Sequence, residues 1–243
     1  MSTLGQLLPK TVKRELKRAL PYYRRFYCPV CDSWDREFQT FGLIPRVNAR
    51  CPTCGALERH RLIWQFFREH TDLFRAPRKR MLHFAPEPMF STRLARLTHL
   101  DYLTADLYGP AMAKVDITDM PFEDQSFDVL SCSHVLEHVP DDHKALRECY
   151  RVLKPGAWAA LMVPIFREPT VEDPAITDPQ ERERLFGQVD HVRKYGPDFE
   201  ERVQGAGFSV RRYTADDVIA GVARRRLAIG AGEGPVFLCR REA

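Results

Sequence analysis

The chain has 243 residues, of which 44% are hydrophobic and 29% are charged. This composition supports one sizeable core with a small additional module and excludes a disordered protein. No apolar run reaches the length of a membrane span, and the N-terminus does not have the pattern of an export signal, so we expect a cytoplasmic protein.

Positive charge is concentrated at the start of the chain. The net charge is +4 in total and +6 within residues 1–27, hence −2 elsewhere. We expect residues 1–27 to form a basic helix. It could hold RNA phosphates while neighbouring aromatic side chains stack on bases. The alternative, favoured because charge runs on helices are commonly solvated, is an exposed helix anchored by those aromatics. They are Tyr22, Tyr23, Phe26 and Tyr27.

Two cysteine knuckles follow, Cys28-Pro-Val-Cys31 and Cys51-Pro-Thr-Cys54, separated by 19 residues. This spacing is typical of a zinc ribbon, and four thiolates close the tetrahedron, so the metal would be structural. Gly55 permits the left-handed turn after the second knuckle. Disulfides are the alternative, but the absence of an export signal speaks against them. So does the presence of three further cysteines in apolar patterns, Cys132, Cys149 and Cys239.

A connecting helix is predicted after the second knuckle. Residues 56–70 place Leu62, Ile63, Phe66 and Phe67 at helical spacing, which indicates one apolar face. A basic linker with a proline comes next, and we place the domain boundary near residue 76. The expected domains are therefore the ribbon with its helix, residues 28–76, and a larger domain, residues 77–243.

The larger domain begins with alternating strands and helices. Arg80–Phe84 is predicted as a strand, Pro88–Leu97 as a helix with proline in its first turn, and Asp106 as the end of a second strand. Phe127–Cys132 and Ala157–Val163 are short apolar runs typical of buried parallel strands. Such a pattern builds an α/β doubly wound sheet, in which ligands gather at the carboxyl ends of the strands.

A helix joins the last two of these strands. Asp141 and Asp142 are its N-cap candidates, and its apolar residues recur at helical spacing. We expect Lys154-Pro155-Gly156 to end it. The carboxyl ends that would face a ligand are then residues 133–137 and 164–167.

The segments DITDMPFEDQSFDV, HVLEHV and LRECYRVLKPG resemble the class I S-adenosylmethionine-dependent methyltransferases. The resemblance implies a Rossmann-like sheet of seven strands and S-adenosylmethionine as cofactor. Val210–Tyr213 and Val236–Cys239 would supply the sixth and seventh strands, with the last one forming an antiparallel edge.

The resemblance also assigns cofactor contacts. Asp116 would accept a hydrogen bond from the adenine amino group, the backbone amide of Ile117 would meet the ring, and Asp106 would bind both ribose hydroxyls. The alternative is that both acids only cap turns. Their joint register with two strand ends favours the cofactor role.

The family's glycine-rich loop is replaced here by Leu-His-Phe-Ala-Pro-Glu, residues 82–87. Ala85 is a mild replacement, whereas Glu87 could bind the cofactor's ammonium group or mark a site that has lost affinity. The loop resembles a variant in zinc-ribbon-bearing bacterial methyltransferases, which implies a working site with altered geometry. An arginine from residues 59–61 could then meet the cofactor's carboxylate. We assign cofactor binding to His83, Ala85, Glu87, Asp106, Asp116, Ile117, Ser133 and His134.

Two histidines are candidate general bases. His134 ends the fourth strand and should face the cofactor pocket, while Glu137 and His138 could only cap the next helix. His191 lies in a long polar segment, residues 167–198, whose length indicates a functional loop. Its D-H-x-R-x-Y pattern resembles a segment of related methyltransferases. His191, Arg193 and Tyr195 are polar groups with catalytic or phosphate-binding potential, and we assign substrate binding to them. Hydrogen bonding between this loop and the core is an equal alternative.

The function that these patterns predict is methyl transfer to an unidentified acceptor, a small molecule or a saccharide. An RNA base methyltransferase that uses the ribbon and the basic helix is a second interpretation. A non-catalytic binding module on a degenerate scaffold is the third. The acceptor atom and the oligomeric state stay open, because a fold does not determine them.

Overall fold

The computed structural model describes residues 25–42, 44–75, 77–230 and 233–243. The basic helix predicted for residues 1–27 therefore lies almost wholly outside the described residues. The chain divides into two compact units. The first comprises the residues up to Glu69 together with Ala215–Glu233, and the second comprises His70–Thr214 with Gly234–Ala243.

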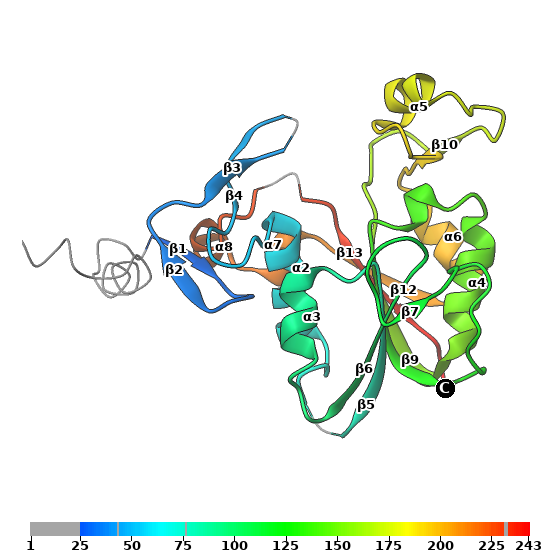
Figure 1. Cartoon of the computed structure of the whole chain (residues 1–243), viewed down its shortest axis with the longest axis horizontal. Coiled ribbons are helices and arrows are strands. Elements are labelled where there is room, and N and C mark those ends of the chain that lie inside the picture. Colours follow the sequence, from blue (N-terminus) through cyan, green and yellow to red (C-terminus); the bar gives the residue numbers. More distant parts are fainter. Residues whose placement is uncertain (1–24, 43, 76, 231–232) are drawn as a thin grey trace, which may run out of the picture. The chain divides into compact units, whose positions relative to one another are not determined.

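Two short antiparallel hairpins build the first unit, and a cysteine knuckle follows one strand of each (Figure 1). The predicted connecting helix is present and buries Leu62, Ile63, Phe66 and Phe67 as expected. Gly55 has a φ of 78°, the left-handed value that the second knuckle requires. The elements are β1 (Phe26–Cys28), β2 (Ser33–Asp35), β3 (Gln39–Phe41), β4 (Arg46–Arg50), α2 (Glu58–His70), α7 (Ala215–Val218) and α8 (Gly221–Arg226).

Arg61 of α2 holds this unit together. Its side chain is fully buried, and its Nη1 donates to the carbonyl oxygens of Ala49 at 2.9 Å and Ala56 at 2.8 Å. Its Nε donates to Leu227 O at 2.6 Å, and its Nη2 donates to Ala228 O at 2.8 Å. The segment 215–233 is thereby joined to the ribbon, which the sequence patterns did not indicate.

A seven-stranded sheet forms the second unit, in the order β12-β13-β9-β8-β5-β6-β7. The strands are β5 (Lys79–Phe84), β6 (Leu100–Asp106), β7 (Ala113–Lys114), β8 (Phe127–Ser133), β9 (Leu153–Met162), β12 (Ser209–Tyr213) and β13 (Val236–Arg240). The predicted Rossmann-like fold with an antiparallel last strand is confirmed. The expectation that this strand forms the edge is wrong, because β13 lies between β9 and β12 and pairs antiparallel with both.

Helices cover both faces of this sheet (Figure 1). α4 (Asp142–Val152) and α6 (Phe199–Gly205) lie together on one face, and α3 (Pro88–Leu94) lies on the other. Asp141 caps α4, as its side chain accepts a hydrogen bond from Lys144 N at 2.8 Å. A buried apolar core joins α4 and α6 to the sheet.

Two predicted boundaries differ from the structure. α3 ends at Leu94 instead of Leu97. Lys154-Pro155-Gly156 does not form a loop after α4, because β9 begins directly at Leu153, which pairs with Phe127. Gly156 has a φ of 79° at this point, where the register between β8 and β9 shifts.

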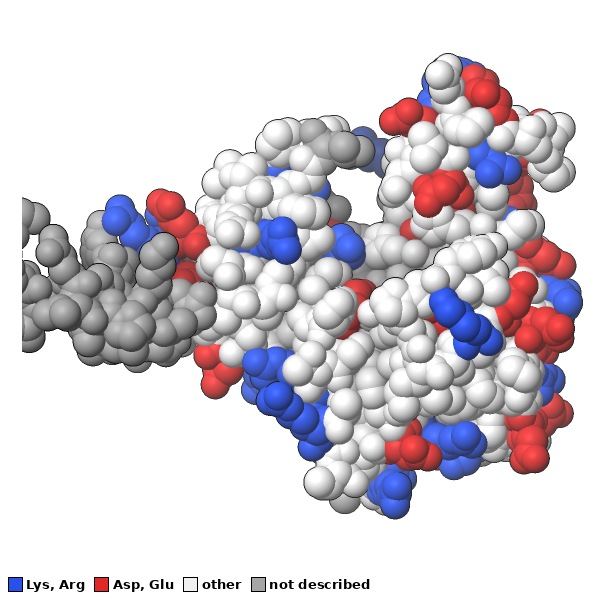
Figure 2. Space-filling view, in the orientation of Figure 1, with Lys and Arg blue, Asp and Glu red and all other residues white. Residues whose placement is uncertain are grey.

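The polar 167–198 segment contains a small antiparallel pair, β10 (Val171–Glu172) with β11 (Arg193–Lys194), and the helix α5 (Pro179–Phe186). Acidic and basic side chains are interspersed over the face of the second unit drawn in Figure 2. Among the described helices, none is both long and apolar enough to cross a membrane.

Candidate functional site

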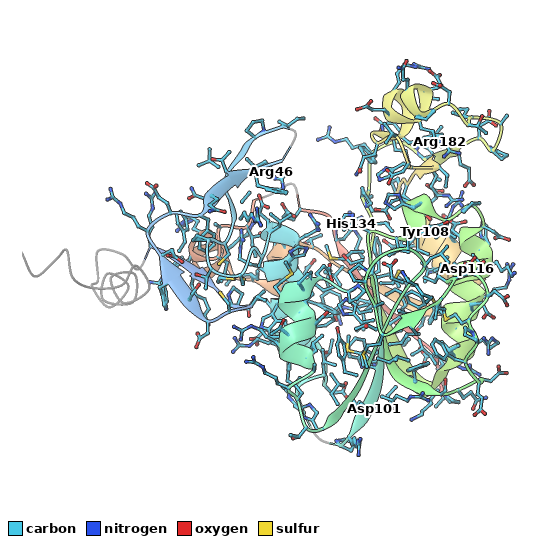
Figure 3. The ribbon with its side chains drawn as sticks, in the orientation of Figure 1. Arg46, Asp101, Tyr108, Asp116, His134 and Arg182 are labelled. Carbon is cyan, nitrogen blue, oxygen red and sulfur yellow. The ribbon has the colours of Figure 1, made fainter. Side chains whose placement is uncertain are left out.

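The predicted cofactor residues gather at one end of the sheet. Figure 3 shows His134, after β8, and Tyr108, after β6, at this end, whereas Asp101, at the start of β6, lies at the opposite end. The parallel strands β5, β6 and β8 all finish here, so their carboxyl ends lie where ligands of doubly wound folds bind.

The loop after β5 has a glycine-like conformation without a glycine. Ala85 has a φ of 47°, which costs a non-glycine residue about 1–2 kcal/mol. Its amide donates to Ala105 O on β6 at 2.9 Å, which fixes the turn. The backbone therefore adopts a conformation for which glycine is the usual residue, and only the Ala85 methyl group is added.

His83 lies buried beneath this loop and joins three elements. Its Nδ1 lies 2.7 Å from the hydroxyl of Tyr102 on β6, and its Nε2 lies 3.1 Å from Oε2 of Glu87 at the start of α3. Burial raises the pKa of Tyr102 to about 12, so its hydroxyl keeps its proton at neutral pH. His83 thus fixes the loop, and the predicted contact between Glu87 and the cofactor's ammonium group stays a prediction.

Asp106 ends β6, and one of its two carboxylate oxygens is engaged in hydrogen bonds. Oδ1 accepts hydrogen bonds from the amides of Tyr108, at 2.7 Å, and Gly109. The turn is tight, since a Cβ on Gly109 would lie 3.1 Å from the Asp106 carboxyl carbon. Oδ2 has no hydrogen bond within the described residues. The turn-capping role is therefore present, and one oxygen is left for a ribose hydroxyl.

Asp116 has a comparable arrangement after β7. Its Oδ1 accepts from both the amide and the hydroxyl of Thr118 at 2.8 Å, and the side chain is exposed. Ile117 beside it is buried. The adenine contacts of both residues stay predictions.

Glu148 and Arg151, in the LRECYRVLKPG segment, fix the loop that follows Asp116. The sequence did not reveal this role. Arg151 on α4 donates to both carboxylate oxygens of Glu148 at 2.7 Å and to the carbonyl oxygens of Phe122 and Met120. Glu148 in turn accepts from Met120 N at 2.9 Å. Hydrogen bonds from Arg151 lower the pKa of the Glu148 carboxyl. The pair therefore connects α4 to the loop that follows Asp116.

His134 follows the buried Ser133 at the end of β8, with a left-handed φ of 55°. Its side chain is one third exposed, at 33%, and its Nδ1 lies 3.1 Å from Oε1 of Glu137. Glu137 and His138 belong to the short 3-10 turn η3 (Leu136–His138), and Asp141 instead caps α4. The suggestion that Glu137 and His138 only cap the next helix is therefore wrong.

His191 reaches the same place from the 167–198 segment. Its Nδ1 lies 3.1 Å from Phe186 O, which can only accept, so Nδ1 carries the proton. Burial lowers the pKa of His191, which favours the neutral ring. Ligand atoms of Glu137, His138 and His191 lie within 4.8 Å of one another. The structure thus brings both predicted bases, His134 and His191, to Glu137.

Arg193 and Tyr195 lie away from solvent. Arg193 donates to Leu136 O at 2.9 Å, Pro140 O at 2.8 Å and the Glu172 carboxylate at 2.8 Å. The Tyr195 hydroxyl donates to the buried Asp142 at 2.7 Å. These contacts match the alternative of loop-to-core hydrogen bonding. An acceptor-binding role for Arg193 and Tyr195 stays a prediction that their contacts disfavour.

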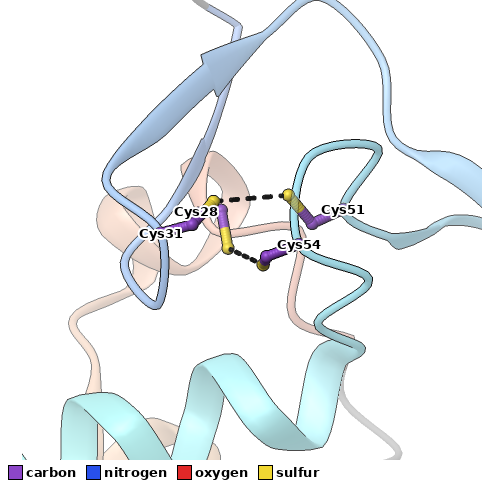
Figure 4. A group of neighbouring side chains, drawn as sticks. All are labelled: Cys28, Cys31, Cys51 and Cys54. Atoms are coloured by element: carbon purple, nitrogen blue, oxygen red, sulfur yellow. Dashed lines mark hydrogen bonds between the residues drawn. The ribbon is translucent and has the colours of Figure 1, made fainter. Parts of the chain in front are cut away.

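The four cysteines of the knuckles lie together in the first unit (Figure 4). Cys28 and Cys54 sulfurs are 3.7 Å apart, as are those of Cys31 and Cys51. A tetrahedral Zn²⁺ with Zn–S bonds of about 2.3 Å requires sulfurs about 3.8 Å apart. The distances are far too long for disulfides and fit a zinc site.

Parts of the chain are similar to known proteins. Residues 86–161 match the family described as "Methyltransferase domain". A stretch of 56 residues is 46% identical to "Sterol methyltransferase-like 1" of Botryococcus braunii and covers 23% of this chain and 14% of that protein. A stretch of 71 residues is 37% identical to demethylmenaquinone methyltransferase of Listeria monocytogenes and covers 29% of this chain and 30% of that protein. The chain thus spans less than a third of the length of either relative.

Among solved structures, a protein assigned as a sarcosine dimethylglycine methyltransferase from Galdieria sulphuraria is similar with a TM-score of 0.51. The sequences are 15% identical, and the similarity covers 75% of this chain and 85% of that one. This likeness concerns the fold alone.

Proposed function

We propose that the chain is an S-adenosylmethionine-dependent methyltransferase whose cofactor binds at the carboxyl ends of β5, β6 and β8. The observation that carries the proposal is that the methyltransferase-domain match, residues 86–161, contains the carboxyl ends of β6 and β8. The left-handed backbone of Ala85 supports it, and so does Asp106, which uses Oδ1 for the turn and leaves Oδ2 for a ligand. A degenerate scaffold would not need to retain a strained turn at this loop.

The predicted cofactor contacts are distributed over the strand ends as follows. The amide side of the Ala85 turn would approach the amino-acid part of the cofactor, with His83 and Glu87 fixing the loop. Asp106 would accept from the ribose through Oδ2. Asp116, Ile117 and Ser133 would line the adenine side, which Glu148 and Arg151 hold in place.

The bound cofactor would supply a methyl group already activated by a sulfonium. The protein's work is then to align the acceptor's lone pair with the S–CH₃ bond, so that the new bond forms as the old one breaks and its electrons return to sulfur. An acceptor that is a hydroxyl or an ammonium must also lose a proton. His134 is the candidate base, because it is partly exposed and Glu137 holds its Nδ1.

We further propose that Cys28, Cys31, Cys51 and Cys54 bind one structural Zn²⁺. Four thiolates leave no open position for substrate, so the ion would stabilise the first unit. This assignment fits a reducing cytoplasmic setting, in which the thiols stay available.

The acceptor class that we propose is a small molecule, a saccharide included. The names of the two sequence relatives refer to sterols and to demethylmenaquinone, which are small molecules. RNA is the alternative acceptor, and it would involve the basic residues 1–24, which lie outside the described structure. The experiment below therefore includes RNA binding.

Calorimetry with S-adenosylmethionine and with S-adenosylhomocysteine tests the cofactor site. Asp106→Ala should weaken binding by roughly 5- to 150-fold, which corresponds to about 1–3 kcal/mol for a lost buried hydrogen-bond acceptor. Asp101→Ala is the matched control, because Asp101 lies on the same strand at the opposite end of the sheet (Figure 3) and is exposed. It should bind like the wild type.

No binding of either compound to the wild type at millimolar concentration would refute the proposal and leave the non-catalytic module. Equal loss in both variants would show that the register of Asp106 is wrong. Salt-sensitive binding of the wild type to RNA would instead favour an RNA acceptor.

A further inference from the structure

Three potential metal ligands lie together beside His134. Glu137 and His138 come from η3, directly after β8, and His191 comes from the 167–198 segment, over fifty residues later. One ligand atom from each lies within 4.8 Å of the others. The rings of His138 and His191 meet edge to face, with centroids 4.7 Å apart. This group is far in sequence from the four cysteines and contains no sulfur.

Two polar atoms of this group lack a partner. Glu137 is 1% exposed and His191 is 5% exposed. Their Oε2 and Nε2 atoms are buried without a hydrogen-bond partner in the described part of the chain. Each such atom costs about 1–3 kcal/mol, and native proteins rarely leave one unexplained. Two of them in one group indicate an occupant that both can bind.

The remaining polar atom of each residue is held by an outer partner. His191 donates Nδ1–H to Phe186 O, so the lone pair is on Nε2. His138 Nδ1 lies 3.2 Å from the carboxylate of Asp190. Glu137 Oε1 lies 3.1 Å from His134. Metal sites in proteins have this organisation, because a carbonyl or carboxylate fixes the tautomer and direction of each ligating histidine.

We propose that Glu137, His138 and His191 bind one divalent transition-metal ion, through Oε2 of the glutamate and one ring nitrogen of each histidine. Two imidazoles and a carboxylate are a ligand set for Zn²⁺, Fe²⁺ or Mn²⁺, and three protein ligands leave open positions. Bonds of about 2.0–2.2 Å require ligand atoms roughly 3–3.5 Å apart. Side-chain rotations in η3 and in the 167–198 segment would therefore draw the ligands together.

The chemistry of the open positions follows from what surrounds the group. His134 and His138 are each 33% exposed, so the ion would be reached from their side. An acceptor with adjacent hydroxyl oxygens, such as a saccharide, could occupy two positions at once. This role rests on the proposed methyltransferase function, whereas binding of the ion does not. With His191 as a ligand, His134 is left as the base.

The test measures metal binding without methyl transfer. Full-length protein is treated with a chelator, loaded with Co²⁺ or Zn²⁺, desalted and analysed for metal. We expect two ions per wild-type chain. Co²⁺ at the cysteines shows sulfur-to-metal charge-transfer absorption, which Co²⁺ at nitrogen and oxygen ligands lacks. Cys51→Ser should lose the first ion and its charge-transfer band but keep the second.

Variants then locate the second ion. Glu137→Gln preserves the shape of the side chain, and both it and His191→Gln should lose the second ion while the charge-transfer band stays. Asp190→Asn, which changes only an outer partner, should weaken the second ion roughly 10- to 100-fold. His143→Gln is the matched control, since His143 is exposed on α4, and it should bind two ions.

A single ion per wild-type chain, removed by Cys51→Ser, would overturn the proposal and indicate that water fills the group. Two ions in Glu137→Gln and in His191→Gln would also overturn it. Circular dichroism of each variant separates lost ligands from lost structure, and an unfolded His191→Gln leaves the isosteric Glu137→Gln to decide. Calorimetry with S-adenosylmethionine does not depend on the metal analysis. Failure of the metal-site proposal is therefore distinguishable from failure of the cofactor-site proposal.

Discussion

Arg61 in the first unit and Arg193 in the 167–198 segment are both almost fully buried, yet different groups accept their hydrogen bonds. Arg61 donates to backbone carbonyl oxygens and lies over the ring of Phe38, at 4.8 Å. Arg193 combines carbonyl oxygens with the carboxylate of Glu172. A buried guanidinium can thus organise backbone with or without a hydrogen-bonded carboxylate, provided that its donors are satisfied.

The largest effect is expected where no other group can replace the arginine. Arg61→Met should destabilise the first unit by about 3 kcal/mol or more, because several buried carbonyl oxygens lose their donor together. Thermal unfolding with zinc release as the readout measures this loss. Arg68→Met on the exposed side of the same helix is the control and should change stability by about 0.5 kcal/mol at most. Similar losses in both variants would contradict the central role of Arg61.

A smaller effect is expected for Arg193→Lys. Lysine keeps the charge near Glu172 but cannot reach Leu136, Pro140 and Glu172 with a planar fork. We expect a loss of about 1–3 kcal/mol, confined to the 167–198 segment. Hydrogen exchange of that segment measures it. Arg184→Lys on α5, where Arg184 is exposed and paired with Glu181, should leave exchange unchanged, and an equal effect there would refute the assignment.

The smallest effect is a pH dependence of stability, which we expect around Arg193 and not around Arg61. Burial alone would raise the pKa of the Glu172 carboxyl, but hydrogen bonds from Arg202 and Arg193 outweigh burial and lower that pKa. A carboxyl whose pKa is lower in the folded state stabilises the protein above its unfolded pKa of about 4.3. That contribution is lost as the pH falls through the folded value.

The protection of the 167–198 segment, measured as its exchange rate relative to unfolded peptide at the same pH, should therefore fall below about pH 4.3. Glu172→Gln should remove this pH dependence. The contacts of Arg61 with carbonyl oxygens have no proton to gain, so they should not add a dependence of this kind. A pH profile that is the same in Glu172→Gln and in the wild type would show that another group titrates.

The sequence predicted the sheet because its strands are apolar runs with clear boundaries, and it predicted the capping role of Asp141 from local chemistry. Periodicity does not report strand order, and the edge position expected for β13 was implied only by the family resemblance; β13 instead lies inside the sheet. The continuation of β9 through Pro155 and Gly156 was missed for a similar reason. Strand pairing with β8 decided that conformation, and turn propensity did not.

The candidate site was predicted residue by residue but not contact by contact. His134 and His191 were both identified from sequence as candidate general bases. Their common proximity to Glu137 depends on the path of the 167–198 segment, which the sequence does not give. For Arg193 and Tyr195 the sequence left ligand binding and loop-to-core hydrogen bonding as equal alternatives. The burial of both side chains is a tertiary property, so the sequence could not decide between the two.

The pairing of Arg61 with Leu227 has a consequence for synthesis of the protein. The two residues are 166 positions apart, so the first unit needs a segment that leaves the ribosome after almost the entire sheet. The cysteine knuckles are translated early, but Arg61 has no partner at 215–233 until late. Nascent chains should therefore depend on early metal capture, or on a chaperone, to keep the apolar face of α2 from aggregating while the rest is made.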